Sequence, residues 1–223
     1  MRETLTLLIA IAVGASTPTR PSDCARDELA GPVHTVVTTR QIVQDGADGR
    51  PDTSQLLVAE DTYDRTCTLV ESKEYKGDFV DDQHFERVDA TTVIVHSNMG
   101  DRTLHERYDE TGRLVESRTT RGQGEFVERS LFVYDGNDRV VRIDGLDAAG
   151  KPYDVTTFTR DAGGHVVRRV VHFGDGRTEI QTSRYEFDKH GNWIKEYNSG
   201  NDPDHDVTTI RPTDILFRAI TYY

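Results

Sequence analysis

Short runs in which apolar and polar residues alternate recur along the chain from residue 33 to its end. A period of two is typical of β-strands with one face turned towards a core. Val outnumbers Leu and Thr is abundant, and both β-branched residues suit a pleated sheet better than a helix. The pattern predicts strands at residues 33–43, 55–63, 67–75, 80–88, 92–97, 102–109, 113–120, 126–135, 139–146, 153–160, 165–173, 177–187, 192–198 and 214–222.

A turn motif of the form aromatic–Asp–x–x–Gly recurs at strand ends, most clearly from Tyr108 to Gly112. The Asp carboxylate is expected to accept a backbone N–H two residues on, and the Gly to adopt the left-handed conformation that ends the turn. Cys67 and Asp138 stand at the Gly position of two copies, and residues 88–92 form a degenerate copy. The residues assigned to these repeat turns are Tyr63, Asp64, Tyr108, Asp109, Gly112, Tyr134, Asp135, Asp161, Gly164, Phe187, Asp188 and Gly191.

A second set of Gly-, Asn- and Asp-containing turns lies about halfway between the first. Such short connections join antiparallel neighbours, because parallel strands need long crossovers. The sequence therefore predicts an all-β fold, an antiparallel up-and-down meander of tandem hairpins. Its polar strands cannot fill a thick core, so we expect one large curled or partly wound sheet. The one helix expected outside the leader is short, between Asp23 and Leu29.

These turns resemble those of the YD-repeat, or Rhs-repeat, proteins, whose Tyr-Asp-x-x-Gly-Arg-Leu unit is matched best by residues 108–114. The resemblance covers roughly residues 55–223 and implies a β-shell built from tandem copies. The chain is too short to enclose a toxin, and it resembles more the small exported members. Those end with a Gly-Asn-Trp turn, here residues 191–193, and with a strand like residues 218–223. The resemblance transfers no functional residue.

Residues 1–16 read as a secretory signal peptide, with Arg2 before a short apolar stretch and small residues at 13–15. Residues 17–32 would form an N-terminal segment and residues 33–223 the repeat domain. Polar residues precede Cys24, which argues against a lipoprotein signal. The prediction is an exported protein, periplasmic or extracellular.

Cys24 and Cys67 are the two cysteines of the chain. In an oxidising compartment two cysteines most simply form one disulfide, and this one would tie the N-terminal segment to the first hairpin. The alternative is a reactive thiol, although nothing near either cysteine in the sequence would lower its pKa.

The net charge of −12 and the pI of about 5.1 argue against a nucleic-acid partner, because phosphate binding needs a basic face. No stretch after the leader has the about 20 apolar residues that a spanning helix needs, so we expect no membrane insertion of the mature chain. The partner expected is a protein or a polymer of the cell envelope.

No residue pattern indicates catalysis, a cofactor or a metal. The eight histidines are scattered, and the carboxylates of residues 202–206 match no complete calcium loop. Trp193 could serve as a platform for a sugar or peptide, but the repeat already accounts for it as the apolar residue after a turn.

The first functional hypothesis is therefore a non-enzymatic exported repeat protein that acts as a binding or structural module. The second is a hydrolase of envelope glycan, which requires two buried carboxylates with raised pKa values facing each other in a cleft. The third is an accessory or immunity protein beside a toxin.

Overall fold

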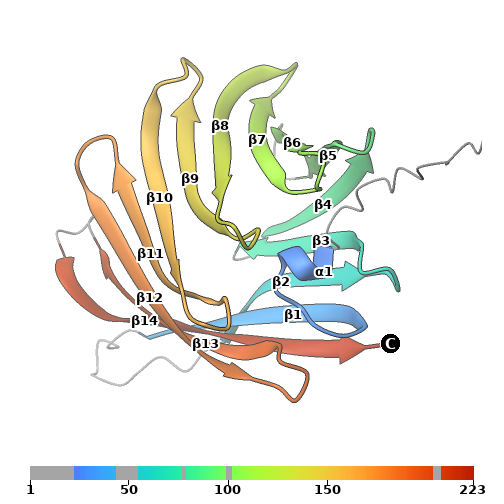
Figure 1. Cartoon of the computed structure of the whole chain (residues 1–223), viewed down its shortest axis with the longest axis vertical. Coiled ribbons are helices and arrows are strands. Elements are labelled where there is room, and N and C mark those ends of the chain that lie inside the picture. The colour runs from blue at the N-terminus through green and yellow to red at the C-terminus, as the bar shows by residue number, and fades with distance from the viewer. Residues whose placement is uncertain (1–22, 44–54, 77–78, 99–101, 203–206) are drawn as a thin grey trace, which may run out of the picture.

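The computed structural model describes residues 23–43, 55–76, 79–98, 102–202 and 207–223, which form one short helix and fourteen antiparallel strands (Figure 1). The elements are α1 (Asp23–Arg26), β1 (Val33–Ile42), β2 (Gln55–Tyr63), β3 (Leu69–Lys76), β4 (Phe79–Arg87), β5 (Thr92–Ser97), β6 (Arg102–Tyr108), β7 (Leu114–Arg121), β8 (Glu125–Tyr134), β9 (Val140–Asp147), β10 (Pro152–Arg160), β11 (Val166–Phe173), β12 (Thr178–Phe187), β13 (Trp193–Asp202) and β14 (Val207–Tyr222). The all-β class, the antiparallel pairing and the up-and-down order are confirmed.

The sheet closes into a barrel, because each strand pairs with the next and β1 pairs with β14. The expectation of a curled or partly wound sheet is wrong in this respect. An open sheet would leave two edges of unpaired backbone N–H and C=O groups. The closing pair runs from Val33 opposite Tyr222 to Ile42 opposite Asp214, so closure removes both edges along their length.

The last hairpin is longer than the alternation predicts. β14 begins at Val207 rather than at residue 214, and β13 extends to Asp202. The register shifts between Asn198 and Ser199, and Ser199 pairs there with Pro212, which has no N–H to give to a ladder. The proline and the polar residues before it predict a break in the strand. The bulge lets the strand continue through the proline.

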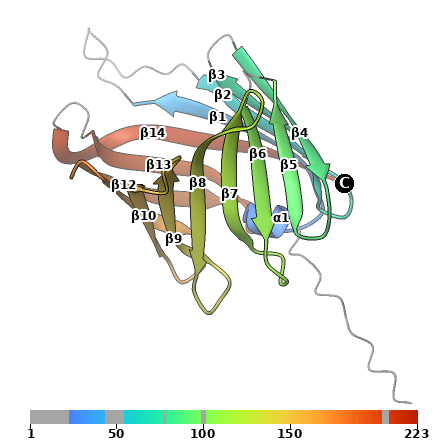
Figure 2. The ribbon, with the colours of Figure 1, turned by 90° about the horizontal axis from the view of Figure 1, so that it is seen from above.

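The two sets of turns lie at opposite ends of the barrel. All the aromatic–Asp turns follow even-numbered strands, and so does the degenerate copy after β4. In an up-and-down barrel these strand ends share one rim, which is also the rim where β1 starts and β14 ends. The turns of the second set form the other rim (Figures 1 and 2).

The aspartates of the aromatic–Asp turns accept hydrogen bonds from the backbone of their own turns. Asp109 Oδ1 accepts the N–H groups of Thr111 at 2.9 Å and Arg113 at 3.0 Å, and the Thr111 hydroxyl also donates to it. Asp64, Asp135 and Asp188 each accept the corresponding two N–H groups. Asp147, in the second set of turns, also accepts two such N–H groups, although the aromatic–Asp motif is absent there. Left-handed backbone is adopted at the Gly position by Gly112, Cys67 and Asp138, with φ of 84°, 59° and 60°.

We expect Asp109→Ala to lower the free energy of unfolding by about 1–2 kcal/mol, because it removes several hydrogen bonds to one carboxylate. Burial alone would raise the pKa of Asp109, but the bonds from Thr111 and Arg113 outweigh it and hold the pKa at about 2. The stabilisation is therefore present above the ordinary carboxyl pKa and is lost as the pH falls towards 2. Urea titrations of the wild type and the variant at pH 7 and pH 2.5 should show a smaller difference in the free energy of unfolding at pH 2.5.

The exposed neighbour Glu110 supplies the control for this turn. Glu110→Ala should leave stability within about 0.5 kcal/mol of the wild type, as is usual for surface substitutions. Equal losses in the two variants would show that the Asp109 carboxylate does not hold the turn.

The register assigns every strand an inward and an outward face, since residues that pair directly share a face. The inward face carries two apolar clusters near the rim of the aromatic–Asp turns. One is built around Val33, Val36 and Tyr63, and the other around Val93, Val95 and Tyr108. Away from these clusters the inward face is largely polar, for example at Ser72, Asp81 and Asn198, which are buried.

Candidate functional site: the barrel interior and its N-terminal plug

Residues 23–30, which we call the plug, lie against the inside of the barrel at the rim of the aromatic–Asp turns (Figures 1 and 2). Cys24 forms a disulfide with Cys67, in the turn after β2. The buried carboxylate of Asp23 accepts hydrogen bonds from the Leu69 N–H at 2.8 Å and from Arg87 at 3.2 Å. The plug is thus attached covalently and by charge to β2–β4.

The Gly-Asn-Trp turn holds the other end of the plug. Asn192 is fully buried, and its side-chain amide pairs with the backbone of Ala30, accepting from its N–H at 2.5 Å and donating to its C=O at 2.9 Å. The same amide donates to the Tyr222 hydroxyl at 2.7 Å. The sequence marks both segments as end motifs, but it does not show that they meet around the plug.

Arg218 and Trp193 form the centre of a buried charged cluster beside the plug. The guanidinium lies 3.6 Å from the centroid of the indole ring, and burial lowers its pKa despite the surrounding negative groups. Its Nε and Nη1 are buried and make no hydrogen bond among the described residues. Trp193 is therefore covered by a side chain of this protein and does not present a bare platform.

Two carboxylates, Asp61 and Glu196, belong to this cluster, and burial raises the pKa of each. Asp61 accepts from the Ser72 hydroxyl at 2.6 Å, and Glu196 accepts from the Tyr185 hydroxyl at 3.2 Å. Their pKa values respond to Arg218 rather than to one another. They compensate a buried cation, so they are not the facing acid and base that a glycoside hydrolase needs.

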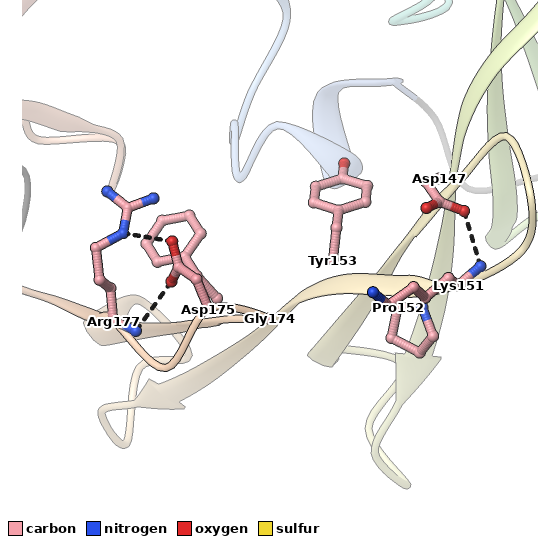
Figure 3. A pocket seen from close by; sticks show the side chains of 8 residues that line it. Asp147, Lys151, Pro152, Tyr153, Gly174, Asp175 and Arg177 are labelled. Atoms are coloured by element: carbon pink, nitrogen blue, oxygen red, sulfur yellow. Dashed lines mark hydrogen bonds and ion pairs between the residues drawn. The ribbon is translucent and has the colours of Figure 1, made fainter.

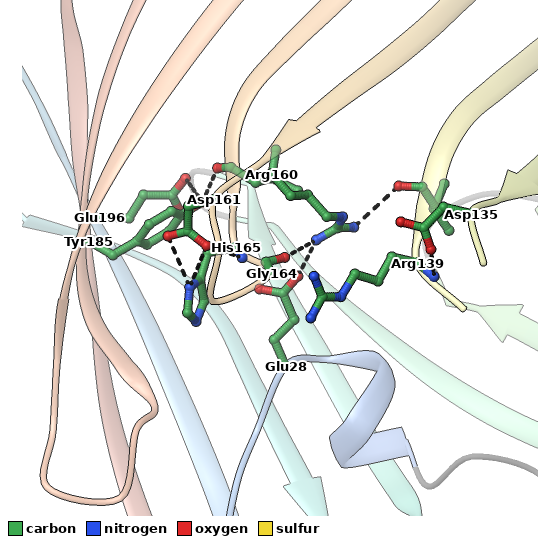
Figure 4. A network of polar contacts seen from close by, with 11 residues as sticks. Glu28, Asp135, Arg139, Arg160, Asp161, Gly164, His165, Tyr185 and Glu196 are labelled. Atoms are coloured by element: carbon green, nitrogen blue, oxygen red, sulfur yellow. Dashed lines mark hydrogen bonds and ion pairs between the residues drawn. The ribbon is translucent and has the colours of Figure 1, made fainter. Parts of the chain in front are cut away.

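Glu28 joins the plug to the turn after β10 (Figure 4). Its carboxylate pairs with Arg160 Nη1 at 2.7 Å, and the same nitrogen donates to the Gly164 carbonyl at 2.7 Å. A side chain at Gly164, whose φ is +97°, would collide with the guanidinium of Arg139. A half-open cavity of about 370 Å³ lies here between the plug and the turns, so it belongs to the seat of the plug.

The opposite rim carries a second cavity, of about 440 Å³, between the turns after β9 and β11 (Figure 3). Tyr153, Phe173 and Pro152 supply its apolar surface, and Tyr153 is 38% exposed. The Tyr153 hydroxyl lies 3.5 Å from Glu128. Burial is the main cause that raises the pKa of Tyr153 to about 12, and the charge of Glu128 is the second. Four charged residues line it: Asp147, Lys151, Asp175 and Arg177.

Water reaches the interior next to this rim. Arg160 contacts the plug and therefore points inward. Phe158, two residues earlier, lies on the same face of β10, and it pairs with Arg169 of β11, so Arg169 also points inward. Arg169 forms an ion pair with Glu179, and the side chains are 40% and 31% exposed. Inward side chains with this much exposure indicate that the interior is accessible to solvent at this depth.

The two histidines that lie in turns, His165 and His190, contact neighbouring side chains of the barrel. His165 contacts Asp161 at 3.3 Å and the ring of Phe187, and His190 packs on Tyr222. Residues 203–206 of the carboxylate cluster and the signal peptide at 1–16 lie outside the described residues. Within the described ranges, no three His, Cys, Asp or Glu side chains are placed to hold a metal ion. No helix in the described part of the chain is long and apolar enough to cross a membrane.

Solved structures identify the fold. A porin-like protein from Bacteroides uniformis matches with a TM-score of 0.54 and 11% identity, over 86% of this chain and 99% of that one. A second porin-like protein, from Bacteroides vulgatus, is 10% identical over the same shares, with a TM-score of 0.48. No protein-family profile matches the chain, and no curated protein does. At this identity the likeness to the first structure concerns the fold alone.

The resemblance to YD-repeat proteins is wrong. The first of these structures, a porin-like protein, shares the fold of this chain, and no family profile supports YD repeats. The motif that carried the resemblance is a way of making a tight turn with Asp and Gly, and such turns arise wherever antiparallel strands are joined. The Asp and Gly residues of the turns therefore predict hairpins, but they do not indicate a protein family.

The exclusion of membrane insertion is also overturned, because the fold that this chain shares with the first structure is a closed barrel. It rested on the absence of an apolar run of about 20 residues, which is a requirement for helices only. Strands of about 9–11 residues cross a bilayer when they close into a barrel, because every backbone group is then paired.

The outward face of the barrel carries charged side chains. Arg107 pairs with Glu116 at 2.9 Å across β6 and β7, and Arg142 Nε contacts Asp144 at 2.7 Å on β9. Outward positions are apolar in the lipid-facing band of a transmembrane barrel. The likeness in fold therefore does not extend to the charged composition of the outer wall.

Proposed function

We propose that this chain is a non-enzymatic, exported barrel of the cell envelope that binds an oligosaccharide segment of an envelope polymer at its open rim. The observation that carries the proposal is the water-accessible interior, which opens beside the aromatic cavity of Tyr153 and Phe173 while the plug occupies the other end.

The chemistry of the cavity suits sugar rings. The face of Tyr153 and the ring of Pro152 offer apolar surface to the C–H faces of a pyranose, whereas Arg177 lies over the ring of Phe173 at 5.0 Å. The charged groups of the two turns stand around them and can bond hydroxyls, although Asp147 also holds its own turn. A cavity of about 440 Å³ is within the usual range for small-ligand sites.

The test is a calorimetric titration of the purified protein with soluble peptidoglycan fragments and with lipopolysaccharide-derived oligosaccharide. Tyr153→Ala should weaken binding of the recognised oligosaccharide at least about tenfold, because it removes the inward aromatic ring.

Tyr75 provides a matched control, because it is an outward tyrosine whose hydroxyl lies 3.4 Å from Glu60, as that of Tyr153 lies 3.5 Å from Glu128. Tyr75→Ala should bind like the wild type. The proposal fails if no oligosaccharide binds, if both variants lose affinity equally, or if the wild type releases new reducing ends during the titration.

A further inference from the structure

Three basic or titratable side chains stand side by side on the outer wall. In the β6–β7 pair His105 lies directly opposite Arg118, and in the β7–β8 pair Arg118 lies directly opposite Arg129. Directly opposite residues on one face have Cβ atoms only about 4.5–5.5 Å apart, and like charges there destabilise a sheet. The row places two permanent positive charges next to each other on a chain whose net charge is −12.

Neighbouring carboxylates neutralise this row only in part. Glu116 is engaged by Arg107 at 2.9 and 3.2 Å, and its contact with Arg129 is 3.9 Å. Arg118 lies over the ring of Phe126 at 4.5 Å and has no carboxylate partner among the described residues. The buried Nε of Arg129 likewise has no hydrogen-bond partner within the described chain.

We propose that Arg118 and Arg129, flanked by His105, bind a phosphate group on the outer wall of the barrel. This site is separate from the oligosaccharide cavity and does not depend on it. A carboxylate is satisfied by one guanidinium, through two parallel hydrogen bonds. A phosphate has more acceptor oxygens and up to two negative charges, so it matches two adjacent guanidinium groups, and binding it removes the like-charge opposition.

The first measurement is a titration of the intact protein with inorganic phosphate at low ionic strength, with chloride at equal ionic strength as the reference. Saturable binding above chloride is expected. Arg118→Gln and Arg129→Gln should each weaken it at least about tenfold, the loss expected for a charge-assisted hydrogen-bonded pair.

Arg168 is the matched control, because it is an outward arginine on β11 whose cross-strand partners, Thr159 and Thr182, carry no charge. Arg168→Gln should keep phosphate affinity within about twofold of the wild type. A second measurement needs no variant. In the wild type, phosphate should shift the side-chain Nε–Hε resonances of Arg118 and Arg129 more than that of Arg168. Absence of saturable binding, or an equal response at Arg168, would overturn the proposal.

The phosphate could belong to a phosphosugar or to a lipid headgroup, and two further probes separate these sources. Glucose 6-phosphate is titrated in solution, and phosphatidylcholine vesicles with and without phosphatidic acid are tested by co-sedimentation. Binding to either probe that Arg118→Gln abolishes and Arg168→Gln retains supports the site and names its source. Binding to both probes that is independent of Arg118 overturns it.

Discussion

Replacing Cys24 and Cys67 together by Ser is expected to lower the free energy of unfolding by about 4 kcal/mol. The disulfide closes a loop with a sequence separation of 43, and loops of this length gain about that much from restriction of the unfolded chain. Urea unfolding of the oxidised wild type and the double variant at pH 7 measures the difference. Reduction of the wild type should reproduce most of it.

Hydrogen exchange distinguishes release of the plug from unfolding of the barrel. In the double variant the amides of Leu29 and Ala30 should exchange faster, because the disulfide no longer holds the plug, while amides of β8–β10 keep their protection relative to global stability. A double variant as stable as the wild type would show that Asn192 and the Asp23 contacts are sufficient to hold the plug.

Arg218→Met is expected to cost about 3–5 kcal/mol. It keeps apolar contact with Trp193 but removes the positive charge that lowers the pKa values of Asp61 and Glu196, and leaving buried carboxylates without a compensating cation has costs of this size. Arg184→Met is the control, because Arg184 also lies over an aromatic ring, that of Tyr197, but on the exposed outer wall. It should lose less than about 1 kcal/mol.

The pH dependence of the Arg218 variant tests the cause. Burial holds the pKa values of Asp61 and Glu196 above their ordinary values, so in the folded state each carboxylate gains a proton before it does so in the unfolded chain. Protonation removes the uncompensated charge, and the penalty should shrink as the pH falls from 7 towards 4.5. Glu196→Gln in the Arg218→Met background should recover part of the loss at pH 7. A penalty that is constant with pH would point to lost packing.

Local chemistry made most of the strands predictable. The ends of β2, β6, β8, β10 and β12 fall within about two residues of the expected positions, because Asp-centred turns fix where each strand stops. The last strand was placed wrongly because Pro212 and the Asp-rich segment before it look like loop residues, whereas a bulge in the β13–β14 ladder accommodates the proline.

Closure and the plug depend on contacts between residues far apart in the sequence. Nothing in the alternation of β1 or β14 distinguishes two edges from a closing pair, since either strand could present the same faces at an edge. Asn192 looked like an ordinary turn residue, and its role follows only from its hydrogen bonds to Ala30, 162 positions away. The cavity at Tyr153 likewise joins two turns that the sequence treats as separate.

An even number of strands brings Val33 and Tyr222 to the same rim, the one that the plug occupies. A fusion partner or surface tether joined after Tyr223 would therefore emerge on that side and leave the turns around Tyr153 and Phe173 unobstructed. Immobilised in this orientation, the molecule would present the rim opposite the plug to the solution.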